Sequence, residues 1–281
     1  MSRYTSARDG AWRLWFRDDL WNQEIWQAVR QLMRGERPRS HPRTLEIRIA
    51  GTQRAFVKIF FAHSIAGALK DCFRRSKGVR ALLIAETLAD QRFNAPVAIG
   101  AGEERSAGIL RRSFLVSLPV EGSPLPDFLR DRFDARVPAL SLPGKREMLR
   151  ELAREIRRFH DQGFVHGDLV PGNIFAALNP QGRARFSFMD NDRTRRYPAW
   201  LRHRLWRRNL VQLNRFPLAG ISLQDRMRFF HGYVKLHKLG SKERKFLRWL
   251  EEKTRQRRRE CDAVDASGSF RRLMRWQAPA H

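Results

Sequence analysis

VHGDLVPGNIFA, residues 165–176, places Asp168 and Asn173 five positions apart in a loop between two β-type runs. FSFMDND, residues 186–192, ends a strand-like apolar run on Asp190, 22 positions after Asp168. Metal-assisted phosphoryl transfer requires this combination: one carboxylate orients or deprotonates the attacking hydroxyl, while an amide and a second carboxylate hold magnesium against the phosphate oxygens. The pattern therefore predicts a phosphoryl-transfer site with Asp168 as catalytic residue and Asn173 and Asp190 as metal ligands.

Two neighbouring polar residues are expected to support this site. His166 precedes Asp168 in the same loop, and we expect its side chain to brace the loop by a hydrogen bond rather than to move protons. Asp192 follows Asp190 by two positions, and it is either a second metal ligand or a cap for the loop that follows.

The N-terminal half has the pattern of a small sheet with a helix. Residues 43–61 predict a β-hairpin whose second strand carries Lys58 inside an apolar run. Residues 64–91 predict helical structure that includes Glu86, and strand-like runs follow at 96–102 and 112–120.

The C-terminal half is predicted to be mostly helical. Residues 145–162 carry apolar side chains on one helical face, and residues 198–259 are helical and very basic. The fold class is therefore α+β, with a β-rich N-terminal part that includes a helix, a hinge near residues 118–124, and a larger helical part.

Composition narrows the functional classes. The 281 residues carry 56 Lys and Arg against 29 Asp and Glu, a formal charge of +27, which favours a polyanionic partner. Two cysteines, Cys72 and Cys261, exclude a disulfide scaffold and a zinc site built on several thiolates. The sequence shows neither an apolar stretch long enough to span a bilayer nor a secretory signal, so we expect any membrane contact to be peripheral.

The loop motif resembles a known catalytic loop. His166-Gly167-Asp168 with Asn173 resembles that of the protein-kinase-like phosphotransferases, and Asp190 resembles the metal-binding Asp of their DFG element. The resemblance implies a bilobal protein-kinase-like fold, with ATP and Mg²⁺ as cofactors.

Two residues of the N-terminal half extend this resemblance. Lys58 is similar to the kinase lysine that holds the α- and β-phosphates of the nucleotide, and Glu86 is similar to the helical glutamate that pairs with it. All these elements occur in the order typical of the superfamily, and the resemblance therefore assigns Lys58 and Glu86 to nucleotide binding.

Departures from the protein-kinase pattern point to one branch. No GxGxxG occurs within residues 36–55, Gly167 replaces the arginine of the HRD form, and no APE element follows MDND. Over most of residues 35–216 the chain resembles the lipopolysaccharide core kinases of the Kdo kinase and heptose kinase type, which are basic and have an HxD loop, an IDFD-like element and a following Arg-rich helix.

This resemblance implies an ATP-dependent kinase that phosphorylates a Kdo or heptose hydroxyl of the lipopolysaccharide inner core. It implies a peripheral position at the cytoplasmic face of the inner membrane of a Gram-negative bacterium. The expected partners are the lipid A-core precursor and the anionic membrane surface, to which each nearby Lys or Arg contributes about 1 kcal/mol of attraction. Which sugar and hydroxyl accept phosphate stays open, and the sequence indicates no protein partner.

The expected organisation has four segments: an amphipathic helical segment at 1–34, a nucleotide-binding lobe at 35–119, a catalytic and metal-binding lobe at 120–240, and a basic helical tail at 241–281. Within the first, residues 11–34 have Trp, Ile, Leu and Val at helical spacing. This helix either packs on the chain's own core or meets lipid headgroups.

Two alternatives remain at this point. A small-molecule phosphotransferase of the aminoglycoside or choline kinase type would use the same loop, but the basic chain suits a cationic substrate poorly. A basic nucleic-acid-binding protein without catalysis would explain the charge alone. We expect no nucleic-acid partner, because readout motifs are missing from the sequence and charge does not explain the Asp168, Asn173 and Asp190 set.

Overall fold

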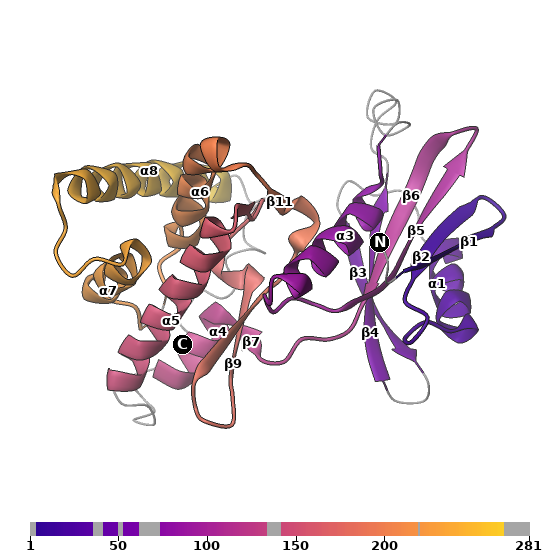
Figure 1. The fold of residues 1–281 in the computed structure, drawn as a ribbon, viewed down its shortest axis with the longest axis horizontal. Helices are drawn as coiled ribbons and strands as arrows, with labels where there is room; N and C mark the ends of the chain where they lie inside the picture. Colours follow the sequence, from indigo (N-terminus) through magenta and orange to yellow (C-terminus); the bar gives the residue numbers. More distant parts are fainter. Residues whose placement is uncertain are drawn as a thin grey trace. The chain divides into compact units, whose positions relative to one another are not determined.

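A computed structural model describes residues 4–35, 42–49, 53–61, 74–133, 142–218 and 220–266. The chain divides into two units, Met1–Val120 and Glu121–His281. Figure 1 shows the elements of each unit along the chain.

An antiparallel sheet is the framework of the first unit. Among the described residues it has six strands in the order β1-β2-β5-β6-β4-β3. Their bounds are Thr5–Asp9 (β1), Trp12–Phe16 (β2), Arg43–Ile49 (β3), Gln53–Phe61 (β4), Ala98–Ser106 (β5) and Ile109–Ser117 (β6). The predicted hairpin is thus confirmed as β3 and β4, and the two later runs are confirmed as β5 and β6.

Two helices cover opposite faces of this sheet (Figure 1). Helix α1 (Gln23–Gly35) buries its apolar stripe against one face, where Val57 and Ile59 of β4 are fully buried. Helix α3 (Lys77–Asp90) packs on the other face, against Leu115 of β6 and its neighbours. Because side chains alternate along a strand, Lys58 of β4, which pairs with Leu115, lies on the α3 face.

The helix predicted over residues 11–34 was wrong in its first half. Residues 12–16 form strand β2, and helix begins only at Gln23. The apolar positions of WRLWF fit strand alternation as well as a helical face, so periodicity alone did not separate them. The sequence signal for a β-hairpin here was Asp9-Gly10. Gly10 lies in the two-residue turn between β1 and β2 and has a φ of +58° there, which glycine adopts without strain.

Burial settles where this tryptophan-rich segment packs. Trp12, Trp15 and Trp26 are each less than 10% exposed, within the core of the first unit. Of the two alternatives in the sequence, packing on the chain's own core is therefore confirmed for these three side chains.

The second unit is mostly helical, as predicted. Its helices are α4 (Leu125–Phe133), α5 (Leu142–Asp161), α6 (Ala199–Asn214), α7 (Leu223–Val234) and α8 (Ser241–Ala266). Among the described residues, none of the helices combines the length and apolar character that crossing a membrane requires. Residues 267–281 of the predicted tail, and residues 64–73 of the predicted helical region with Cys72, lie outside the described residues.

Short strands of the second unit frame the motif segments. Strands β7 (Ser123–Pro124), β9 (Ile174–Leu178) and β10 (Ala184–Phe188) form one small sheet, in the order β10-β9-β7. Strand β8 (Phe164–Val165) pairs with β11 (Arg195–Arg196). The predicted loop therefore runs from the end of β8 to the start of β9, and MDND follows β10.

Candidate active site

The segment from His166 to Asn173, here called the HGD loop, connects β8 to β9 and ends in the 3-10 turn η1 (Pro171–Asn173). Strands β9 and β10 pair in register from Ile174 opposite Phe188. This pairing brings the end of the HGD loop beside Met189 and Asp190, 16 or more positions later in the sequence.

His166 joins the two segments. Its ring is fully buried, its Nε2 lies 2.8 Å from the carbonyl oxygen of Met189, and its Nδ1 accepts from the backbone N–H of Asp168 at 3.1 Å. Because the carbonyl only accepts, Nε2 carries the proton and the imidazole is neutral. The predicted brace is therefore present, and both ring nitrogens are used in positioning.

Asn173 fastens the other end of the loop. The backbone N–H of Met189 donates to the carbonyl of Asn173 at 2.8 Å, and the Asn173 Nδ2 donates to the carbonyl of Asp168 at 2.9 Å. With its nitrogen used in this way, the amide of Asn173 would present Oδ1 to a metal ion. Asp168 itself is half-buried, in the middle of a loop held at both ends.

Asp190 has an unusual backbone. Its φ of 56° and ψ of 49° lie in the left-handed region, which costs a non-glycine residue about 1–2 kcal/mol. The next residue supports this turn: the Asn191 Nδ2 donates to the carbonyl of Phe188 at 2.6 Å, and its Oδ1 accepts from the Thr194 hydroxyl at 3.1 Å. Strained backbone of this kind is concentrated at functional sites, where it aims a side chain.

These donors fit a hard divalent cation. Carboxylates and an amide oxygen are the oxygen ligands that Mg²⁺ prefers, and Mg²⁺ is usually held by one or two carboxylates together with substrate phosphates. The described part of the chain has no cluster of three or more His, Cys, Asp or Glu residues suited to a metal ion. Asn173 and Asp190 are therefore suited to a metal completed by a phosphate ligand, and half-buried Asp192 in the turn η2 (Asn191–Arg193) lies two positions after Asp190.

Lys58 and Glu86 belong to the first unit. Lys58 is half-buried on the α3 face of β4, and its ammonium lies 5.3 Å from the centroid of the Phe60 ring. Glu86 is half-buried in the third turn of α3. The structure thus places both residues on the same side of one sheet.

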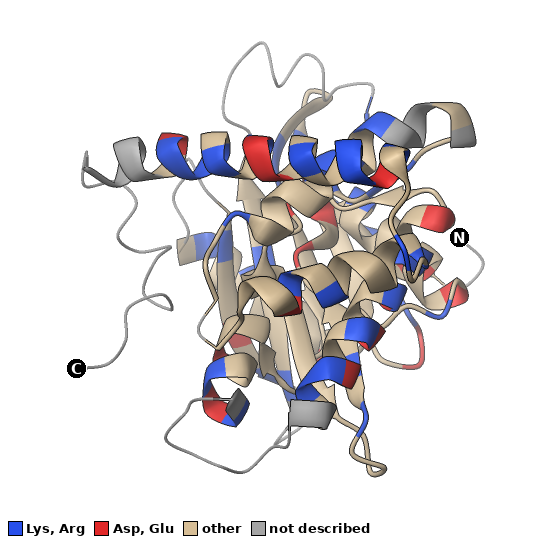
Figure 2. Ribbon diagram, turned by 90° about the vertical axis from the view of Figure 1, so that its left-hand side faces the viewer, with Lys and Arg blue, Asp and Glu red and all other residues tan. Residues whose placement is uncertain are grey.

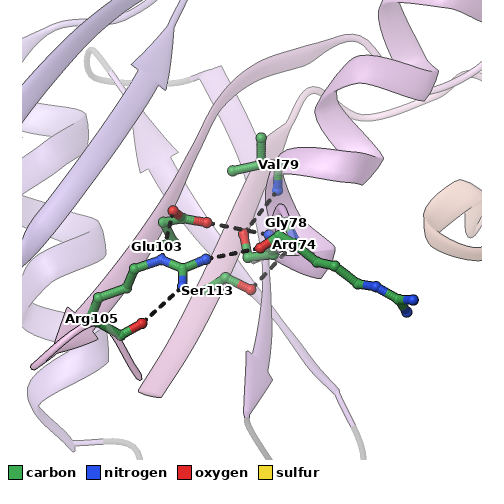
Figure 3. A network of polar contacts seen from close by, with 8 residues as sticks. Arg74, Gly78, Val79, Glu103, Arg105 and Ser113 are labelled. Atoms are coloured by element: carbon green, nitrogen blue, oxygen red, sulfur yellow. Dashed lines mark hydrogen bonds and ion pairs between the residues drawn. The ribbon is translucent and has the colours of Figure 1, made fainter. Parts of the chain in front are cut away.

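The start of α3 is fixed by a buried polar network (Figure 3). The Glu103 carboxylate, 6% exposed, accepts from the backbone N–H of Ser76 at 3.3 Å and from the Arg105 Nε at 2.9 Å. Arg105 in turn donates to the carbonyl of Arg74 at 3.0 Å. A Cβ on Gly78 would lie 2.3 Å from the Phe114 carbonyl oxygen, so glycine permits the helix to approach β6 closely.

The sequence pattern of the "Lipopolysaccharide kinase (Kdo/WaaP) family" matches residues 22–233. The chain belongs to the lipopolysaccharide kinase family. A solved structure described as "WaaP in complex with acyl carrier protein" is similar to it with a TM-score of 0.59 and 20% identity, covering 87% of this chain and 99% of that one. Among curated proteins, no sequence matches the chain.

Membership in the lipopolysaccharide kinase family confirms the predicted resemblance, and the likeness to WaaP confirms the predicted fold class. The chain is accordingly assigned to the phosphotransferases.

Sequence reasoning missed two amides of α6 that hold the HGD loop in this lipopolysaccharide kinase. Asn209 accepts from the backbone N–H of His166 at 3.0 Å and donates to its carbonyl. Gln212 accepts from the N–H of Leu169 at 3.2 Å and donates to the carbonyl of Gly167 at 3.2 Å. We call Asn209 and Gln212 the α6 amide pair. Their spacing of three positions puts both on one face of a helix, which is the only signal the sequence offered.

Two further buried residues complete the support of Asn209. The His160 Nε2 lies 3.2 Å from its Oδ1, and the His160 Nδ1 lies 2.8 Å from the Tyr233 hydroxyl. Burial lowers the pKa of His160 to about 3, and burial also raises the pKa of Tyr233. His160 is thus neutral, with Nε2 donating to Asn209 and Nδ1 accepting from Tyr233.

Gly167 explains the missing arginine of the HRD form. A Cβ at Gly167 would lie 2.2 Å from the Cβ of Arg193 and 2.9 Å from its carbonyl oxygen. Because strand β11 pairs with β8 directly before the HGD loop, the Arg193 backbone occupies the space that a larger residue at position 167 would need.

Proposed function

We propose that this protein transfers the γ-phosphoryl group of ATP, in the presence of Mg²⁺, to a Kdo or heptose hydroxyl of the lipopolysaccharide inner core. One observation carries the proposal: Met189 joins the segment of Asp168 to that of Asp190. The His166 ring donates to the carbonyl of Met189, and the N–H of Met189 donates to the carbonyl of Asn173. Family membership supports the substrate class.

Each site residue has one role in this proposal. Asp168 orients the acceptor hydroxyl and takes its proton, while Asn173 and Asp190 hold the metal that neutralises charge on the phosphate oxygens. Lys58, supported by Glu86, binds the α- and β-phosphates of ATP. His166 positions Asp168 through its backbone. The metal supplies electrostatic stabilisation of the transferring group.

We place this reaction at the cytoplasmic face of the inner membrane, with the protein bound peripherally. The net charge of +27 suits an anionic lipid surface and an acceptor that carries phosphates and acidic sugars. Exposed arginines directly after MDND, at Arg193, Arg195 and Arg196, are the part of this charge next to the HGD loop.

Phosphate transfer from radiolabelled ATP to purified lipid A-core acceptors, with and without Mg²⁺, tests the proposal. Asp168→Ala should lower the rate by about 10²–10⁴-fold, the usual contribution of a positioned acid or base. Asp190→Ala should be similarly inactive, whereas Asp131→Ala, which removes an exposed carboxylate of α4, should keep the wild-type rate. Transfer only to soluble sugars or amines would overturn the lipopolysaccharide substrate and favour the soluble phosphotransferase alternative.

We also infer a protein partner, an acyl carrier protein, from the complex in which WaaP was solved. The second unit supports this inference with an apolar cavity of about 420 Å³ among α4, α5, α6, α7 and α8, lined mainly by leucine and phenylalanine, with Arg226 and Arg255 among its lining residues. An acyl chain is the part of such a partner that fits an apolar cavity.

Leu223, 76% exposed at this cavity, provides a mild test. Leu223→Glu should weaken binding of an acylated carrier protein in a pull-down and leave the folded structure intact. Ile109→Glu, a matched change at an exposed position of the first unit, should have no effect. Equal binding by both variants would contradict the cavity as the acyl site.

A further inference from the structure

A second cavity lies in the helical unit, apart from the HGD loop. It has a volume of about 600 Å³ and is lined by residues of α5, α6, the end of α7 and the start of α8. Four cationic side chains line it, against the two carboxylates of Asp161 and Glu243, so that its lining has an excess of positive charge. One of these carboxylates, Asp161, is already bonded to Arg157 at 2.8 Å and paired with Lys235 at 3.3 Å.

Two of the four cations, Arg157 and Arg207, lie within cation–π distance of aromatic rings. The Arg157 guanidinium carbon lies 4.9 Å from the centroid of the Trp206 ring. The Arg207 guanidinium carbon lies 5.0 Å from the Phe246 ring and 5.5 Å from the Trp249 ring. A cation–π contact of this kind restricts the movement of a guanidinium group, and because Arg157 is already bonded to Asp161, Arg207 is the arginine of this cavity suited to a bidentate anion.

The other two cations, Lys242 and Lys245, come from the first turns of α8 and are exposed. Figure 2 shows that lysine and arginine recur along α8, interspersed with acidic residues. A phosphate group is matched to such a cavity because a guanidinium group binds two of its oxygens at once, while lysines add point charges.

We propose that this cavity is a binding site for a phosphate-bearing ligand, with Arg207 as its principal contact. The phosphate belongs either to a lipid headgroup or to a soluble phosphate ester, and both present the same dianionic or monoanionic oxygens to the arginine. The site is separate from the HGD loop, and none of its lining residues is among those proposed for phosphoryl transfer.

The test measures stabilisation by inorganic phosphate against thermal unfolding, with sodium chloride at equal ionic strength as reference. Arg207→Leu should weaken phosphate binding by about tenfold or more, the usual loss when a charge-assisted hydrogen-bonding partner is removed. Arg208→Leu removes the same charge from the next, exposed position of α6 and should keep the wild-type affinity. Phosphate that binds at the HGD loop should stabilise both variants equally against thermal unfolding, and the measurement does not depend on catalytic turnover.

Arg207→Lys keeps the positive charge but loses the planar fork, and it provides a second variant should the leucine substitution prevent folding. It should also bind phosphate more weakly than wild type. The proposal is overturned if Arg207→Leu and Arg208→Leu lose affinity equally, or if phosphate stabilises wild type no more than chloride does.

Vesicles distinguish the two sources of phosphate. Binding to phosphatidylglycerol vesicles that falls in Arg207→Leu, but not in Arg208→Leu, and is competed by inorganic phosphate would identify a lipid headgroup. Equal vesicle binding by the two variants, with phosphate affinity lost only in Arg207→Leu, would identify a soluble phosphate ester. Phosphatidylcholine vesicles serve as the uncharged control.

Discussion

His166 and Met189 are joined by a hydrogen bond of 2.8 Å from the imidazole Nε2 to the backbone carbonyl, across 23 positions of sequence. The same ring accepts from the N–H of Asp168, so one buried side chain fixes the spacing between the loop with the first carboxylate and the strand end with the second. His166 therefore positions these two segments, and this role needs no proton transfer.

His166→Ala should lower kcat by about 10²-fold, because a displacement near 1 Å at a reacting group costs that much. The KM for ATP should change little, since the substitution leaves Lys58 and the first unit intact. His166→Gln, which retains an amide donor, should recover part of the rate. Steady-state kinetics measure both effects, and a wild-type kcat in His166→Ala would contradict the positioning role.

Gly167→Ala should destabilise the second unit by about 1–3 kcal/mol, the usual cost of forcing an extra methyl group into a packed site. The new Cβ would overlap that of Arg193. The double variant Gly167→Ala with Arg193→Gly removes one of the two overlapping atoms and should regain part of the loss. Urea unfolding of the four proteins in this cycle measures the coupling, and strictly additive changes would show that the two residues do not interact.

Glu103→Gln should lower the free energy of unfolding by about 1.5–3 kcal/mol, because hydrogen bonds to a charged group contribute that much. The substitution leaves half-buried Arg105 without an ionised partner and weakens the hold on the start of α3. It should also raise the KM for ATP if Glu86 of α3 supports Lys58. Glu46→Gln, at an exposed ion pair of β3, serves as the control and should change neither quantity.

His160 makes stability depend on pH. Its pKa is lowered by burial from 6.5 to about 3, so the unfolded chain binds a proton between these values that the folded protein does not. Above about pH 6.5 this histidine therefore does not lower the free energy of unfolding. As the pH drops from there toward 3, the free energy of unfolding falls by up to about 1.4 kcal/mol per pH unit.

Urea unfolding at pH 7, 6 and 5 measures this dependence. His160→Gln can still donate to Asn209 and accept from Tyr233, but it does not titrate, so its stability should fall less steeply than that of wild type. Parallel pH profiles of the two proteins would show that His160 does not carry the effect.

The proposed site residues that are close together along the chain could be predicted from the sequence. Asp168 and Asn173 are five positions apart, and Asp190 ends a recognisable strand, so local pattern was enough to group them. The α6 amide pair was not recognisable, because an asparagine and a glutamine in an arginine-rich helix have many ordinary explanations. Asn209 meets His166 across 43 positions, and contacts of that separation are set by tertiary packing.

The wrong prediction of a helix at residues 12–16, which form strand β2, has a similar physical basis. Trp12, Leu14, Trp15 and Phe16 are buried or half-buried because β2 lies between β1 and β5 in the sheet, a pairing that no local periodicity reveals. Aromatic residues crowd both faces of this strand, which made its pattern resemble a helical stripe. Once the Asp9-Gly10 turn is read as a hairpin signal, the same residues favour a strand.

The α6 amide pair bonds only main-chain atoms of the HGD loop. The path of the loop is thereby independent of several side chains it carries, and two of its positions have room for change: Val170 is half-buried, and a Cβ at Gly172 would meet no atom within 4 Å. A library restricted to Val170 and Gly172 is consequently the place to begin retargeting this enzyme to a different acceptor alcohol.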